Sequence, residues 1–198
     1  MSTHRIQTLV DGIYAIAMTL LVLNISIPRR TAGPLSITTF NHLLLNLWPK
    51  FWTFGLSFLL LAIFWSTNHR LFRFIKHANP KFLWINLFCL MFVALVPFST
   101  SLIGEYGQYW AAQICFNLNL FVIGSFSYLN WQYAAKYDLL HESVDSMTIV
   151  FAKKRNLVFP VISLVACGLS FITPAWSNLI YILTPFILMM MNQRLMTE

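Results

Sequence analysis

Long apolar runs follow one another along this chain and are separated by short polar segments. A helix that crosses a bilayer needs ~20 mostly apolar residues, and six such runs fit into the sequence. The pattern predicts an all-α membrane protein with six transmembrane helices, which form a single domain over residues 1–198. The predicted helices cover residues 5–28, 43–69, 81–103, 106–135, 156–173 and 175–193.

Several boundaries have a local cause in the sequence. Asn79-Pro80 is typical of a turn followed by a helix start. The uncharged stretch 156–193 is too long for one span, and Thr173-Pro174 divides it. The first run resembles the apolar part of a signal peptide, but no small-residue cleavage pattern follows Ile27, so a retained helix is expected. Between the fourth and fifth helices lies a polar segment, 136–155. Its apolar positions favour a short interfacial or cytosolic helix: Leu139, Leu140, Val144 and Met147.

The basic residues predict the orientation in the membrane. Six spans put both termini on one side, and that side receives ten of the 13 Lys and Arg residues: Arg5, the 70–81 group, the 136–155 group and Arg194. Cytoplasmic loops carry an excess of Lys and Arg, so both termini are expected in the cytoplasm. Three basic residues form the exception and fall outside: Arg29, Arg30 and Lys50.

Composition excludes a soluble domain. Charged residues make up 10% of the chain and hydrophobic residues 58%, whereas soluble domains carry roughly a quarter charged residues. The net charge of +7 lies at the ends of apolar runs and forms no patch for nucleic acid, so no nucleic-acid partner is expected. Cys89, Cys115 and Cys167 lie in apolar runs without CxxC spacing, and predict neither a disulfide framework nor a metal site. No cofactor is expected.

Two stripes run along the first helix. Large aliphatic residues recur at steps of three and four: Leu9, Ile13, Ile16, Leu20, Leu23 and Ile27. Beside them lies a small or polar stripe: Thr8, Asp11, Gly12, Ala15 and Thr19. Small residues normally face other helices in lipid, so the second stripe is predicted to pack. The aliphatic stripe either faces lipid or a protein core, or lines a pore where several copies of the helix surround an axis. Apolar rings of that kind block ions by dewetting.

Asp11 is the only carboxylate inside an apolar run. An ionisable group at membrane depth marks a functional site, either a polar knot that holds helix ends together or part of a gate or ion path. Trp65 and His69 at the end of the second helix, and Asn86 near the start of the third, fall at the same depth. Arg5 lies six residues before Asp11 on the same helix. These side chains predict a hydrogen-bonded network that braces the first helix.

Three segments carry a resemblance to a known family. They are Arg5-x5-Asp11-Gly12-Ile13-Tyr14-Ala15-Ile16-Ala17-Met18-Thr19-Leu20-Leu21-Val22-Leu23, then Phe64-Trp65-x3-His69-Arg70-Leu71-Phe72, then Trp84-x-Asn86-Leu87 with Val96-Pro97-Phe98-Ser99-Thr100. This set resembles the transmembrane protein 175 family of potassium channels, densely over residues 5–104 and beyond them mainly in helix count. The family has Arg, three residues, then Phe-Ser-Asp, whereas this chain has Leu9 and Val10 in place of Phe and Ser.

The resemblance implies a function and a site. One six-helix repeat per chain is similar to the bacterial members and implies a homotetramer in a bacterial inner membrane, with copies of itself, lipid and permeant potassium as its partners. It also implies that the first helix lines the pore, with Ile16 as the narrowest ring and Leu20 and Leu23 extending it outward. Thr19 offers a hydroxyl near the ion path. A looped selectivity filter is not expected, and Gly104-Glu105-Tyr106-Gly107 is interpreted as an exterior turn.

Other classes of function remain as alternatives. A secondary transporter or proton-coupled carrier would use Asp11 as its titrating group, although such proteins usually show inverted repeats and broken helices. A membrane enzyme would need a nucleophile–base pair or a metal site, and the five His residues show no metal-type spacing on one helix. A lipid-binding scaffold has no feature that favours it.

Overall fold

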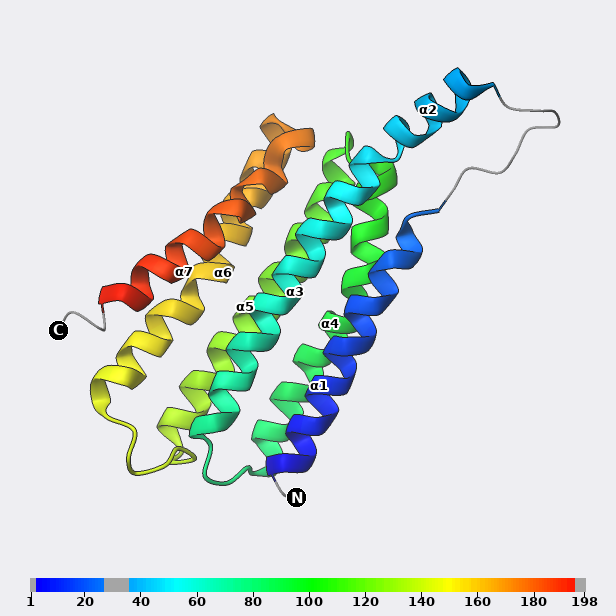
Figure 1. Cartoon of the computed structure of the whole chain (residues 1–198). Coiled ribbons are helices and arrows are strands. Elements are labelled where there is room, and N and C mark those ends of the chain that lie inside the picture. Colours follow the sequence, from blue (N-terminus) through cyan, green and yellow to red (C-terminus); the bar gives the residue numbers. More distant parts are fainter. Residues whose placement is uncertain (1–2, 27–35, 195–198) are drawn as a thin grey trace.

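The computed structural model describes residues 3–26 and 36–194, which form helices joined by short loops (Figure 1). Six of its helical stretches are long and apolar enough to cross a membrane, in agreement with the predicted number. The elements are α1 (Thr3–Leu20) with its 3-10 continuation η1 (Leu21–Asn24), α2 (Ile37–Asn46), α3 (Trp48–Phe74), α4 (Pro80–Tyr106), α5 (Trp110–Lys136), α6 (Ser146–Ile172), the 3-10 stretch η2 (Pro174–Ile182) and α7 (Leu183–Arg194).

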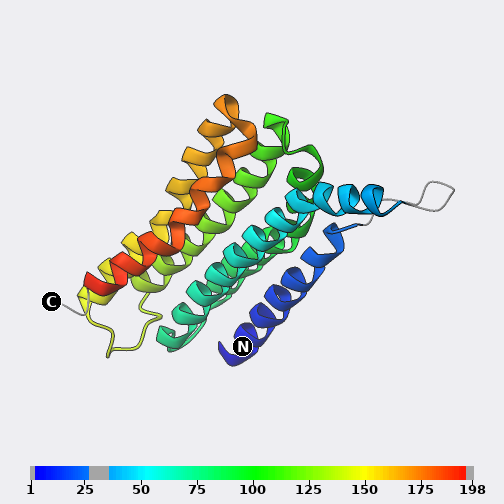
Figure 2. The same ribbon diagram turned by 45° about the horizontal axis from the view of Figure 1, so that its top comes forward.

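The helices run side by side along a common direction (Figures 1 and 2). α5 packs against α4 on one side and α6 on the other, and η2 and α7 complete the flank beyond α6. α1 lies at the opposite edge, where it packs on α3 and α4. α1 begins and α7 ends at the same end of the bundle (Figure 1). α2 projects from the other end and buries none of its residues.

Side-chain caps fix two of the helix starts. Asn79 Oδ1 accepts a hydrogen bond of 2.9 Å from the Phe82 backbone N–H, and Pro80 takes the first helical position of α4. Asp145 Oδ1 accepts in the same way from Thr148 N–H at the start of α6. Such caps satisfy amide groups that have no partner within the helix. The Asn79-Pro80 helix start predicted from sequence is confirmed.

Polar contacts between helices hold the core of the α5, α6 and η2 flank together. Tyr181 in η2 donates from its hydroxyl to Asn117 Oδ1 of α5 at 2.9 Å and lies 3.2 Å from Ser163 Oγ of α6. Asn117 in turn donates to Ser170 Oγ of α6 at 3.0 Å. All four side chains are buried. Within a membrane, where apolar burial drives helix association weakly, such bonds and close packing specify the arrangement.

The prediction for residues 136–155 is wrong in two respects. α6 begins at Ser146, ten residues before the predicted start at 156, so Lys153, Lys154 and Arg155 lie within the helix. No separate interfacial helix forms around 139–147 in the described structure, because Leu139 and Leu140 bind the α3–α4 loop instead. Leu139 O accepts from Lys76 N–H at 2.8 Å, and Leu140 forms an isolated β-bridge with Ile75.

Other boundaries differ less. α3 covers Trp48–Phe74 where 43–69 was predicted, so Arg70 lies inside the helix. The segment Gly104–Tyr106, interpreted above as a turn, is the last turn of α4. The predicted end of the first helix at residue 28 and the two outer arginines, Arg29 and Arg30, lie outside the described residues.

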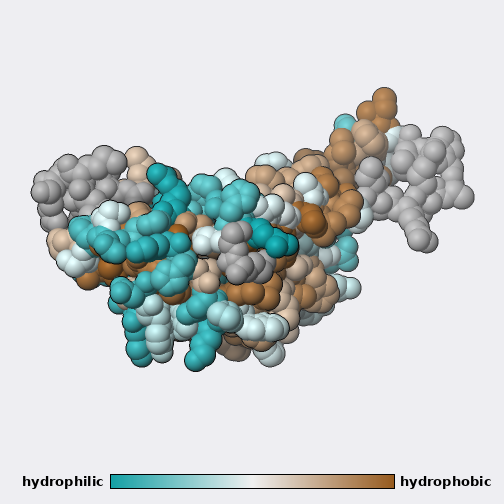
Figure 3. All heavy atoms as spheres, turned by 90° about the horizontal axis from the view of Figure 1, so that it is seen from below, coloured by the Kyte–Doolittle hydropathy of each residue, from teal (hydrophilic) through white to brown (hydrophobic). Residues whose placement is uncertain are grey.

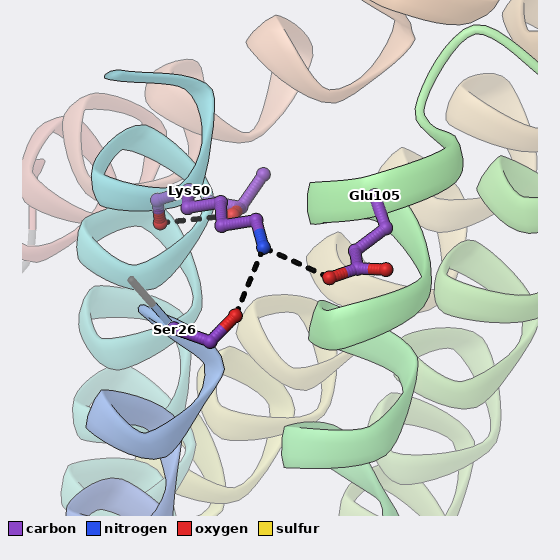
Figure 4. A network of polar contacts seen from close by, with 4 residues as sticks. Ser26, Lys50 and Glu105 are labelled. Atoms are coloured by element: carbon purple, nitrogen blue, oxygen red, sulfur yellow. Dashed lines mark hydrogen bonds and ion pairs between the residues drawn. The ribbon is translucent and has the colours of Figure 1, made fainter. Parts of the chain in front are cut away.

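An ion pair joins three segments at the end of the bundle from which α2 projects (Figure 4). Lys50 Nζ near the start of α3 lies 2.8 Å from Glu105 Oε1 near the end of α4. The same ammonium donates to Ser26 Oγ, just after η1, at 3.2 Å. Lys50 thus connects the end of the first span with the second and third spans.

Candidate pore-lining helix and its support

One face of α1 and η1 is exposed along its whole length. The exposed fractions of the three aliphatic residues predicted to form a constriction are 60% for Ile16, 42% for Leu20 and 71% for Leu23. Large aliphatic side chains left uncovered in the single chain must be covered by lipid or by another protein chain. This face is therefore the candidate site.

The opposite face of this span packs into the bundle. Its buried residues recur at steps of three and four: Ile6, Val10, Tyr14, Ala17 and Leu21. Within the chain, the packing face of this span is therefore made by aliphatic and aromatic side chains.

The small stripe predicted to pack is instead exposed in the single chain. Thr8, Gly12, Ala15 and Thr19 face outward, and a Cβ added to Gly12 would meet nothing within 4 Å. Within the single chain, larger residues on the other face of α1 pack against α3 and α4, so the small stripe does not pack on its own bundle. The small residues therefore lie on the same exposed face as Ile16 and Leu20.

Thr19 keeps its hydroxyl proton within its own helix. Thr19 Oγ1 donates to the backbone carbonyl of Ile16 at 2.8 Å, a common bond for threonine in a membrane helix. Its oxygen lone pairs stay on the exposed face, so the residue offers an acceptor there rather than a donor.

An apolar groove borders the exposed face. A cavity of about 350 Å³ lies between α1 and α4 and is lined by Ile16 and Leu20 from α1 and by Leu87, Met91 and Ala94 from α4. Its residues are aliphatic or thioether side chains, so it suits hydrocarbon from lipid or from a neighbouring chain.

Two hydrogen bonds connect the lower part of α1 with the end of α3. Trp65 Nε1 donates to Asp11 Oδ1 at 2.7 Å, and Gln7 Nε2 lies 3.2 Å from His69 Nδ1. The rings of Trp65 and His69 also approach each other, with centroids 5.5 Å apart. Gln7 was not singled out from the sequence; its position four residues before Asp11, on the same helical face, is the signal that could have found it.

The remaining two members of the predicted bracing network lie elsewhere. Asn86 is buried and donates to Phe82 O at 2.8 Å and to Asn130 Oδ1 of α5 at 3.2 Å, so its bonds hold α4 to α5 and not to α1. Arg5 is exposed at the start of α1 and forms no salt bridge with any acid in the described residues. The structure thus brings together Asp11 with Trp65, and His69 with Gln7.

The upper end of the span has its own anchor, which the sequence did not reveal. Asn24 Nδ2, the last residue of η1, donates to the backbone carbonyl of Pro97 in α4 at 2.8 Å. Pro97 lies inside α4, and proline within a helix removes one amide donor and loosens the local hydrogen bonding. The bond from Asn24 ties the upper end of the first span to α4.

Among the described residues, no group of three His, Cys, Asp or Glu side chains lies close enough together to hold a metal ion.

Comparison with known proteins identifies the family. The family model of the endosomal/lysosomal potassium channel TMEM175 matches residues 5–97. A potassium channel of Chamaesiphon minutus is 35% identical over 180 residues, which cover 86% of this chain and 85% of that relative. This chain belongs to the TMEM175 family. The resemblance stated from the sequence motifs is confirmed, and the family consists of ion channels rather than enzymes.

Solved structures agree with the TMEM175 assignment. The crystal structure of a lysosomal potassium-selective channel TMEM175 homologue from Chamaesiphon minutus superimposes with a TM-score of 0.83 at 29% identity, over 96% of this chain and 98% of that one. A T38A variant of the potassium channel MtTMEM175 shares the fold with a TM-score of 0.63 at 17% identity, over 98% and 94% of the two chains. Together with six membrane-length helices, these matches make the chain an integral membrane protein with the TMEM175 channel fold.

Proposed function

We propose that four copies of this chain assemble around their α1 helices into a homotetrameric, potassium-permeable channel. The observation that carries the proposal is the exposed face of α1, which lies at the edge of the subunit and presents Ile16, Leu20 and Leu23. The relatives' names, potassium channel and potassium-selective channel, supply the ion.

The small residues on this face support assembly rather than simple lipid exposure. Gly12, Ala15 and Thr19 allow the backbones of neighbouring helices to approach closely, which is the usual role of small residues between membrane helices. The groove beside Ile16 and Leu20 gives hydrophobic side chains of an adjacent subunit a place to pack. α1 would then contact its own subunit on one side and other copies on the other.

In such an assembly, Ile16 forms the narrowest ring and Leu20 and Leu23 continue it toward the outside. Seven residues of helix span ~10 Å, so the three rings make a short apolar constriction. A ring of aliphatic side chains offers an ion no oxygen ligands and blocks it by dewetting when narrow. No looped selectivity filter takes part in this proposal, and Thr19, on the same exposed face, offers a polar acceptor beside the rings.

Asp11 and Trp65 support the constriction from below. Their 2.7 Å bond, with that between Gln7 and His69, ties the lower half of α1 to α3. A helix fixed in rotation presents a fixed set of side chains to the axis. Arg5 lies exposed near the start of α1, before this pair of bonds.

Both termini lie in the cytoplasm of a bacterial cell, and the channel lies in the inner membrane. Arg5, Arg70, Lys76, Lys153 and Arg155 all belong to the end of the bundle where α1 begins and α6 starts. Hydrophilic side chains gather at this end of the molecule (Figure 3). An excess of Lys and Arg on one side is typical of the cytoplasmic face.

Potassium flux from liposomes tests the proposal. Purified wild type is compared with Ile16→Asn and with Leu164→Asn, a control that places the same polar group at an exposed aliphatic position of α6. We expect fast flux in wild type, strongly increased by Ile16→Asn because a polar ring hydrates the constriction, and unchanged by Leu164→Asn. Absence of flux in all three, or equal changes in both variants, contradicts a constriction at Ile16.

A proton-coupled carrier is the second candidate, because Asp11 is a carboxylate inside the first span and is bound to the neighbouring helix. A carrier saturates with substrate and is limited by its conformational cycle, whereas a channel conducts until the gradient is lost. Asp11→Asn distinguishes them: it abolishes transport if the carboxylate carries protons, and leaves ion flux in place if it only braces α1.

A further inference from the structure

Two arginines meet at the cytoplasmic end of the bundle, away from α1. Arg70 Nη2 of α3 donates to Thr67 Oγ1 at 3.5 Å, and Arg155 Nη2 of α6 donates to the same oxygen at 3.4 Å. Two guanidinium groups that share one hydroxyl lie close enough to repel each other strongly where water is scarce. Both side chains are half-buried, so neither is fully screened by solvent.

Four acids of the described residues have partners elsewhere, and none of the described acids pairs with these arginines. Glu142 pairs with Lys76 at 3.1 Å, and Glu105 pairs with Lys50 at the other end of the bundle. Asp11 accepts from Trp65, and Asp145 caps α6. Asp138 is exposed in a turn, with a positive φ of 58°. In the described ranges, no carboxylate forms a salt bridge with Arg70 or Arg155.

The donors of this pair are also incompletely used. Arg70 Nε is buried and has no hydrogen-bond partner among the described residues. Thr67 supplies a neutral oxygen, which cannot compensate two positive charges. A half-buried cation pair without a counter-charge is costly, so the site calls for an anion.

The space around the arginines fits an amphiphilic anion. A cavity of about 160 Å³ lies between α3, α5 and α6 and is lined by Arg70, Arg155 and Asn156 together with Trp131 and Phe151. A second hollow of about 350 Å³ begins at Arg70 and continues between α3 and α7 along apolar side chains: Ala62, Ile63, Pro185, Leu188 and Met189. The positive charge of the two arginines is thus concentrated at one place, and an apolar surface between α3 and α7 extends from it.

The depth of the site matches lipid headgroups. Arg70 lies one turn before the end of α3 at Phe74, and Trp131 lies near the end of α5 at Lys136. Tryptophan and arginine are typical of the membrane interface, and basic pockets between helices on the cytoplasmic side suit phosphate headgroups.

We infer that Arg70 and Arg155 bind the phosphate group of an anionic phospholipid, whose acyl chain lies in the hollow between α3 and α7. Guanidinium groups suit this role because their N–H donors match phosphate oxygens in pairs. The site is separate from the α1 face, so it binds whether or not the channel assignment holds.

Lipid binding to the purified full-length protein tests the inference. Native mass spectrometry measures the affinity for dioleoylphosphatidylglycerol and for dioleoylphosphatidylcholine, which differ in headgroup charge and share their acyl chains. Variants are Arg155→Gln and the matched control Lys154→Gln, which removes an exposed charge from the adjacent position. We expect phosphatidylglycerol to bind more tightly than phosphatidylcholine, and Arg155→Gln to weaken it about tenfold while Lys154→Gln changes it little.

Three results would overturn the inference. Equal affinity for the two lipids removes headgroup recognition. Equal losses in Arg155→Gln and Lys154→Gln indicate diffuse surface charge. Displacement of phosphatidylglycerol by millimolar inorganic phosphate assigns the site to a soluble anion instead of a lipid. If Arg155→Gln does not fold, Arg155→Lys keeps the charge but loses the paired donors, and must still bind phosphatidylglycerol more weakly than Lys154→Gln does.

Discussion

Trp65 of α3 donates its indole N–H to the Asp11 carboxylate of α1 across 2.7 Å, in a pair separated by 54 positions in the sequence. The bond joins the helix with the exposed apolar face to a helix that packs inside the bundle. Because Asp11 lies on an otherwise apolar helix, this partner explains how its polar group is accommodated.

Trp65→Phe is therefore expected to lower the stability of the protein. The variant keeps most of the aromatic packing and removes the donor, so a partly buried acceptor loses a hydrogen bond worth about 1–2 kcal/mol. Thermal unfolding in detergent measures the change as a lower Tm. Trp84→Phe is the control, because Trp84 is exposed on α4. Equal Tm values for the two variants would remove the stabilising role of the bond.

Cysteine at position 16 tests whether copies of α1 surround an axis. In a background with Cys89, Cys115 and Cys167 replaced by alanine, Ile16→Cys would place several thiols around the constriction. Thiolates bind soft divalent metals, so we expect Cd²⁺ to block potassium flux through Ile16→Cys. Leu164→Cys in the same background should be insensitive. Block of both variants, or of neither, contradicts a pore lined at this position.

Gly124 of α5 lies tightly against Pro160 and Phe159 of α6. A Cβ added there would lie 2.9 Å from Pro160 Cδ and 3.0 Å from Phe159 Cβ, so the helices must separate. We expect Gly124→Ala to destabilise the protein by about 1–3 kcal/mol, the usual cost of overpacking.

Gly168→Ala on α6 provides the matched control, because its added Cβ would meet nothing within 4 Å. It should stabilise by about 0.5–1 kcal/mol, since alanine is the better helix former. Chemical denaturation should therefore give a lower free energy of unfolding for Gly124→Ala and a higher one for Gly168→Ala, each relative to wild type. Destabilisation of similar size in both variants would instead point to a general intolerance of the α5–α6 pair.

Asn79 combines two hydrogen bonds that mutation can separate. Its Oδ1 caps α4 and its Nδ2 donates to the Tyr133 hydroxyl of α5 at 3.0 Å. Asn79→Ala should cost about 0.5–2 kcal/mol through the lost cap. Asn79→Asp retains the capping oxygen, and Tyr133→Phe removes only the contact to α5, so both should cost less than Asn79→Ala. If Tyr133→Phe lowers the free energy of unfolding more than Asn79→Ala does, the contact to α5 and not the cap is the main contribution of Asn79.

The sequence alone established the class of protein and the number of spans. The chain has six runs of membrane length and few charges, with breaks at Asn79-Pro80 and Thr173-Pro174. In lipid, the backbone hydrogen-bonding groups of such runs must pair within helices. The motifs around Asp11, Trp65 and Asn86 were enough to recognise the family. Local signals failed where a distant segment competed, as at Leu140, whose backbone pairs with Ile75 instead of forming a helix.

Tertiary structure decided which face of α1 is covered and which polar groups meet. Helical periodicity predicts that Ile16, Leu20 and Leu23 share a face and that Val10 and Tyr14 share another, but in lipid both faces are apolar. Hydrophobicity therefore cannot distinguish the face that packs from the face that is exposed. Polar partners depend likewise on helix rotation and order in the bundle: Asn86 bonds to α5, and Arg70 meets Arg155 from a helix 85 positions away. The spacing of residues in the sequence does not specify the rotation of a helix or its place in the bundle. Close packing of the helices determines both the rotation and the order.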